Sequence, residues 1–189
     1  MLTLTPTRQA LVALAWGALA LAPTRAVDLP SQYLPVIGGA GGSLFRRDCG
    51  AGKVLTGFRY AADPSLTAIG LLCRPVNADG TLGDMTAVGD RAGIARGEGG
   101  QVYCQPGQVV GSATIHYATV VVGVQMRCHA WKPSTRRMGE TYAMAVAIGR
   151  RDIGKATSTS CTADTQPVVG MRGRSELVVD ALGFTCDEP

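Results

Sequence analysis

Six cysteines divide the 189-residue chain into three pairs of nearly constant spacing, and this pattern limits the fold more than any other feature. The two members of successive pairs lie 24, 24 and 25 positions apart, and the first members of the pairs lie 55 and 57 positions apart. A fixed period of this length indicates internal repeats of one supersecondary unit. We place the repeats at about residues 38–76, 94–131 and 149–189. The cysteine pairs are Cys49 and Cys73, Cys104 and Cys128, and Cys161 and Cys186.

The first residues are typical of a secretory signal peptide. Residues 1–8 carry one basic and no acidic side chain, residues 10–22 are apolar throughout, and Ala22 and Ala26 are candidate cleavage sites. Thirteen apolar residues are too few for a membrane-spanning helix, which needs about 20. We therefore expect residues 1–26 to be removed and residues 27–189 to form a single domain without stable membrane insertion. The mature protein would be periplasmic or extracellular.

The charge balance argues against a nucleic-acid partner. Removal of the leader would leave 16 basic residues against 14 acidic ones, and nucleic-acid binding favours a clustered basic face instead. Arginine outnumbers lysine 15 to 3, and alanine and glycine are abundant, which is typical of a GC-rich bacterial coding sequence. We expect an exported bacterial protein, and the sequence leaves its oligomeric state open.

An even number of cysteines in an exported chain indicates disulfide bonds. Six cysteines allow 15 connectivities, and spacing alone does not choose among them. The repeat favours the three local pairs, because one local solution would then be used three times. Each bridge would close a loop of about 25 residues and contribute about 3 kcal/mol in the chain-entropy model. Zinc binding is disfavoured because the chain has no C-x-x-C element and no histidine at ligand spacing.

The residues between the members of each cysteine pair predict a β-hairpin. In the first repeat, residues 54–60 and 66–73 are rich in strand formers and flank the turn-forming Asp63-Pro64. A cysteine before the first strand and a cysteine at the end of the second would lie side by side in the antiparallel pair, within reach of a disulfide. The other predicted hairpins are residues 109–117 with 119–128 and residues 168–174 with 177–186.

The remaining sequence also favours strands, so the fold class is all-β. Residues 140–148 contain Thr141, Val146 and Ile148 and are predicted as a strand, and turn-rich stretches leave room for about two further short strands per repeat. Residues 115–117 resemble residues 58–60 but lie two residues closer to their cysteine. This predicts a shorter turn in the second repeat and a two-residue shift before it.

One combination of motifs resembles a known family. It consists of the glycine-rich residues 38–45, Cys49, then Gly57-Phe58-Arg59 and residues 68–73. It resembles the β-prism proteins, in particular the vitelline membrane outer layer protein I family and, more distantly, the jacalin-related lectins. The resemblance covers nearly all of residues 37–189. It implies a threefold β-prism of three four-stranded Greek-key sheets, here with disulfide-stapled hairpins.

The lectin resemblance also implies a sugar site, formed by loops at one end of the prism from an acidic side chain and backbone N–H groups. Gly41 and Gly42 are candidate ligand contacts, although glycines also suit tight turns at sheet corners without any ligand. Asp180 is a candidate because it fits the repeat pattern, but its counterpart in the first repeat is Thr67. Sugar binding therefore rests on the analogy of folds.

The sequence shows no catalytic constellation, metal site or cofactor motif. The nucleophile elbow G-x-S-x-G is absent, and all six cysteines fit into pairs. His116 lies within a predicted strand, where a structural role is the commoner case. His129 lies in a basic loop and is a candidate ligand contact, as is Trp131, although Trp131 beside Cys128 is also placed to cover a disulfide.

These observations favour an exported, non-catalytic module that binds a glycan or another surface component. One alternative is a structural or protein-interaction role in the cell envelope or extracellular matrix. A second alternative is a weak carbohydrate-active enzyme, which would require two carboxylates about 5–9 Å apart. Binding to a glycan array would separate the first hypothesis from the structural or protein-interaction role.

Overall fold

The structure, a computed structural model, describes residues 32–161 and 166–187, and the regular elements in this part of the chain are all β-strands. The predicted leader, residues 1–26, lies outside the described residues. None of the described segments forms a helix long and apolar enough to cross a membrane. The strands are β1 (Gln32–Tyr33), β2 (Ile37–Gly38), β3 (Ser43–Asp48), β4 (Lys53–Asp63), β5 (Ser65–Pro75), β6 (Thr86–Gly93), β7 (Glu98–Tyr103), β8 (Gln108–Tyr117), β9 (Val121–Lys132), β10 (Arg137–Gly149), β11 (Lys155–Ser160), β12 (Val168–Ser175) and β13 (Val179–Cys186).

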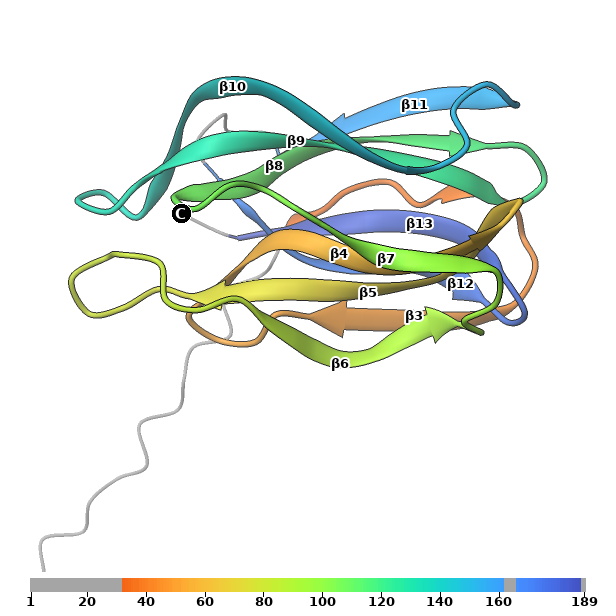
Figure 1. Cartoon of the computed structure of the whole chain (residues 1–189), viewed down its shortest axis with the longest axis horizontal. Coiled ribbons are helices and arrows are strands. Elements are labelled where there is room, and N and C mark those ends of the chain that lie inside the picture. The colour runs from red at the N-terminus through yellow and green to blue at the C-terminus, as the bar shows by residue number, and fades with distance from the viewer. Residues whose placement is uncertain (1–31, 162–165, 188–189) are drawn as a thin grey trace, which may run out of the picture.

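The strands form three antiparallel sheets wrapped around one core, which confirms the predicted threefold β-prism (Figure 1). Sheet A has the order β1–β13–β12–β3, with β2 also paired to β13. Sheet B has the order β6–β5–β4–β7, and sheet C has the order β10–β9–β8–β11. The central pair of each sheet is one of the three predicted hairpins, and β10 covers the strand predicted at residues 140–148.

Each sheet takes one edge strand from the following repeat. The glycine-rich segment before Cys49 leads into β3, which pairs with β12 near the C-terminus rather than with the hairpin of its own repeat. In the same way β7 pairs with β4 of the preceding repeat, and β11 pairs with β8. The prism is therefore closed by the pairing of its first repeat with its last.

The three local disulfides are confirmed, but the predicted geometry within one hairpin is wrong. The bridges are Cys49–Cys73, Cys104–Cys128 and Cys161–Cys186. Cys49 extends β3 in sheet A, where its N–H donates to Val169 O at 2.8 Å, whereas Cys73 lies in β5 of sheet B. Glycines with positive φ at positions 50 and 52 carry the chain across the corner, so that Leu55, not Cys49, lies opposite Cys73. Each bridge therefore joins neighbouring sheets.

The shorter turn and the two-residue shift predicted for the second repeat are also wrong. In every hairpin a pair of residues with three residues between them flanks the turn, and in the first repeat Asp63 and Ser65 also pair inside it. Those pairs are Ala62 and Leu66, Tyr117 and Val121, and Ser175 and Val179. In β8 it is residues 113–115, not 115–117, that occupy the positions of residues 58–60. A shift of two residues keeps every side chain on the same face of a strand, so the alternation of the sequence does not reveal it.

The inner faces of the three sheets meet in a continuous apolar core. Phe58 of sheet B and Phe184 of sheet A are both almost fully buried, and their ring centroids lie 5.9 Å apart. Ile115 and Met126 contribute from sheet C. All six half-cystines are buried at the corners of this core. The core holds the three hairpin turns at one end of the molecule, on the right in Figure 1.

Candidate functional site

A β-bulge marks the same position in all three hairpins, directly after the turn. The bulged residue is Thr67 in sheet B, Val122 in sheet C and Asp180 in sheet A. Bulges re-aim side chains and are common beside functional sites. The threefold arrangement thus gives three equivalent positions at one end of the prism, whose environments can be compared directly.

The two equivalent positions outside sheet A are filled by the protein itself. The Thr67 hydroxyl donates to Arg96 O at 2.7 Å and accepts from Arg96 N–H at 3.3 Å, and only 2% of Thr67 is exposed. Val122 is apolar and 5% exposed, and its carbonyl accepts from Arg150 N–H at 2.8 Å. Neither position presents an unpaired polar side chain to a ligand.

Asp180 differs from both, because its carboxylate faces the glycine loop between β2 and β3. A Cβ atom at Gly41 would lie 2.5 Å from Asp180 Oδ1, and a Cβ atom at Gly42 would lie 2.5 Å from Oδ2. Asp180 Oδ2 is buried yet has no hydrogen-bond partner among the described residues. A buried, unpaired carboxylate oxygen is costly, so it calls for a partner such as a water, an ion or a ligand.

The loop itself requires glycine for close approach. Gly42 has a φ of +65°, and a Cβ atom at Gly39 would lie 2.0 Å from Thr119 O in the β8–β9 turn. Gly39 N–H donates to Asp180 O at 2.8 Å and fixes the loop to β13. The amides of Gly41 and Gly42 make no hydrogen bond within the described part of the chain. Two amide donors therefore lie beside one carboxylate acceptor.

Gly41, Gly42 and Asp180 were predicted from the sequence as individual candidate contacts. The pairing of β3 with β12 brings the two glycines next to Asp180. The candidate set did not include Leu177, which is 54% exposed in the β12–β13 turn at residues 176–178, beside the site. Nor did it include Arg96, in the loop between β6 and β7, whose Nη2 donates to Leu177 O at 3.3 Å. The alignment of Asp180 with Thr67 was the available signal for the bulge.

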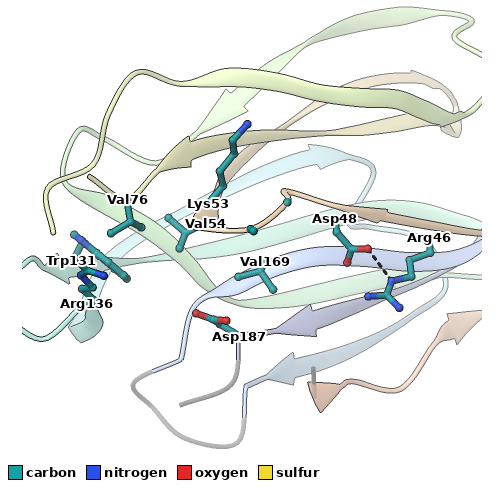
Figure 2. A pocket seen from close by; sticks show the side chains of 12 residues that line it. Arg46, Asp48, Lys53, Val54, Val76, Trp131, Arg136, Val169 and Asp187 are labelled. Carbon is teal, nitrogen blue, oxygen red and sulfur yellow. Dashed lines mark hydrogen bonds and ion pairs between the residues drawn. The ribbon is translucent and has the colours of Figure 1, made fainter. Parts of the chain in front are cut away.

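His129 and Trp131, the other candidate contacts, lie apart from Asp180. Trp131 is 8% exposed, its Nε1 donates to Gly80 O at 2.8 Å, and it lines a pocket of about 440 Å³ beside the corner at Gly50 (Figure 2). In Figure 2, Trp131 and Arg136 lie on one side of this pocket and the Arg46–Asp48 ion pair lies on the other. His129 lines a separate pocket on sheet C.

The groups with shifted pKa values belong to turns rather than to the site. Hydrogen bonds from the side chain and backbone of Thr81 lower the pKa of Asp79. The guanidinium of Arg150 lowers the pKa of Asp152, and that carboxylate in turn raises the pKa of Arg150. In residues 32–161 and 166–187, no three His, Cys, Asp or Glu side chains are grouped so that they would hold a metal ion.

Comparison with known proteins identifies the fold. No protein-family model and no curated protein sequence matches the chain. Among solved structures, wild-type Malaysian banana lectin superposes with a TM-score of 0.56 at 17% identity, covering 85% of this chain and all of the lectin. The mannose-binding jacalin-related lectin of Ananas comosus gives 0.58 at 19% identity, with 84% and 99% coverage. Single-chain recombinant jacalin gives 0.62 at 10% identity, with 87% and 99% coverage. The chain therefore has the β-prism fold of the jacalin-related lectins.

Proposed function

We propose that this protein is an exported, non-catalytic carbohydrate-binding module, and that its sugar site is the carboxylate of Asp180 with the glycine loop of residues 39–42. The observation that carries the proposal is the unpaired Oδ2 of Asp180, at the position that Thr67 and Val122 fill in the other two sheets.

The chemistry of the site suits a sugar. A sugar hydroxyl donates one hydrogen bond and accepts others, so that neighbouring hydroxyls on a ring complement a carboxylate beside amide donors. Asp180 supplies the acceptor, and the unpaired amides of Gly41 and Gly42 supply the donors. Leu177, which is 54% exposed, offers an apolar contact for the C–H face of a ring.

Mannose is the first sugar to test. The lectin of Ananas comosus is described as mannose binding, and a jacalin-related lectin of Morus nigra as mannose-specific and in complex with mannose. A third similar structure is a complex of artocarpin with mannotriose. The superpositions cover 97% or more of each of these three lectins, which supports a search for the sugar site at the same end of the fold. The similarity to lectins favours a carbohydrate-binding module over a carbohydrate-active enzyme.

We also infer export to the periplasm or beyond and a closer relation to the vitelline membrane outer layer protein I family. Three disulfides support an oxidising compartment, and residues 1–26 have the pattern of a leader. The relation to the vitelline family rests on the threefold cysteine pairing and on the glycine-rich residues 38–45. Cell fractionation of the native host tests the export directly.

Titration calorimetry with methyl α-mannopyranoside tests the sugar site. The Asp180→Asn variant exchanges a charged acceptor for an amide of the same shape, and we expect binding about 10- to 100-fold weaker, the value of a hydrogen bond to a charged group. Asp152→Asn is the matched control. Asp152 lies in the loop before β11, which in sheet C is the equivalent of the glycine loop before β3, and the variant should bind like the wild type. If Asp180→Asn binds as tightly as the wild type, the site is not at Asp180.

A further inference from the structure

Arg174 joins the glycine loop to the neighbouring strand through one edge of its guanidinium. It lies near the end of β12, and its Nε donates to Gly41 O at 2.8 Å while its Nη2 donates to Gly42 O at 2.7 Å. Hydrogen bonds from a charged, planar guanidinium are stronger and more directional than neutral ones. The carbonyls of two consecutive glycines are thus held by one rigid group.

The position of these carbonyls fixes the direction of the next amides. The described chain contains no cis peptide bond, and in a trans peptide the C=O and the following N–H point in opposite directions. Because Gly41 O faces Arg174, the N–H of Gly42 faces away from it. That N–H has no acceptor within the described residues, so it is free to donate to a ligand.

The same position in the other two sheets carries no such group. Arg174 is the last regularly paired residue before the bulge, opposite Ala181. The equivalent residue is Ala61 in sheet B, opposite Ala68, and His116 in sheet C, opposite Gly123. Among these three equivalent positions, only the one in sheet A carries a guanidinium, and sheet A is also the sheet with Asp180 at the bulge and Gly41 and Gly42 in the loop. Arg174 is therefore a feature of the candidate site, because the fold does not require an arginine at this position.

We propose that Arg174 is a positioning residue of the sugar site, which holds the Gly41–Gly42 peptides in the orientation that presents the Gly42 amide to the ligand. This inference rests on the proposed function. Glycine peptides rotate freely without such a restraint, and a loop that must be ordered on binding lowers the affinity. Arg174 itself need not touch the sugar.

Arg174→Gln, Arg174→Lys and Arg172→Gln together test the proposal, with methyl α-mannopyranoside as the probe. Arg172 is the matched control, because it lies two residues away on the same strand and donates to Leu34 O rather than to the loop. We expect Arg174→Gln to bind about tenfold more weakly, Arg174→Lys to recover most of the loss, and Arg172→Gln to bind like the wild type. The ¹⁵N relaxation of residues 41–43 should show new mobility in Arg174→Gln and none in Arg172→Gln.

The outcomes separate this inference from the proposed function. Wild-type affinity in Arg174→Gln, together with weakened binding in Asp180→Asn, would overturn the role of Arg174 and leave the sugar site standing. Equal losses in Arg174→Gln and Arg172→Gln, with equal drops in melting temperature, would overturn it in favour of general stability. If the wild type binds no mannoside, the proposed sugar fails, and unchanged loop relaxation in Arg174→Gln would overturn the positioning role as well. Should Arg174→Gln not fold, Arg174→Lys carries the comparison.

Discussion

Removal of one disulfide should destabilise the prism by an amount set by its loop length. In Cys104→Ala with Cys128→Ala, a bridge of sequence separation 24 is lost, which closes a loop of about 25 residues. The chain-entropy relation assigns about 3.5 kcal/mol to such a loop at 25 °C. Both half-cystines are buried at 1% exposure or less, so the loss of packed sulfur adds to this figure. For a chain of this size we expect the melting temperature to fall by about 7–14 °C.

Urea unfolding of the oxidised protein, followed by circular dichroism, measures this loss. Val110→Ala is the control for the packing contribution, because Val110 lies opposite Cys128, is fully buried and takes no part in a bridge. The corresponding double variants of the other two bridges, with sequence separations of 24 and 25, should lose similar amounts. A loss below about 1 kcal/mol in all three double variants would refute the reasoning. The lost packing of the buried sulfurs would by itself account for a loss of that size, and nothing would be left for the chain entropy of the closed loop.

Two further changes test the loop and a turn. Gly39→Ala should destabilise the protein and weaken mannoside binding, because its Cβ would lie 2.0 Å from Thr119 O; thermal melting and calorimetry measure the two effects, and a wild-type melting temperature would contradict the close approach. Thr81→Ala should raise the pKa of Asp79 towards the ordinary 3.8, as measured by NMR titration of its carboxyl group. Because the folded pKa is depressed, the stabilisation by this turn is present above the unfolded pKa and is lost as the pH falls through the folded pKa; an unchanged pKa in the variant would contradict the assignment.

The strands and the disulfide pairing were predictable because they are local. Strand-forming residues recur at fixed distances from each cysteine, and the bridges join cysteines 24 or 25 positions apart. The exchange of edge strands was not predictable, because β3 and β12 are separated by most of the chain and nothing in either sequence specifies the other. The error in placing the bridges within hairpins has the same origin, since Cys49 belongs to the exchanged strand.

The site was predictable only as a set of isolated residues. Gly41, Gly42 and Asp180 were named from a resemblance and a repeat position, and their contact depends on the non-local pairing that encloses them. Arg174 was invisible because its role lies in two backbone carbonyls, which leave no trace in a side-chain pattern. Trp131 was a candidate because an aromatic ring can stack on a sugar, and in the structure it is buried and hydrogen-bonded to Gly80.

The pairing of β3 with β12 has a consequence for the order of assembly. During synthesis, sheets B and C have all their strands once residue 160 has been made, whereas β3 must wait with an unpaired edge until residues 168–175 follow. An exposed strand edge is prone to pair with other chains, and contacts between distant segments form slowly. The carboxylate of Asp180 and the glycine loop come together only when β3 pairs with β12. Ligand binding would therefore occur only in molecules in which the three sheets have closed into the prism.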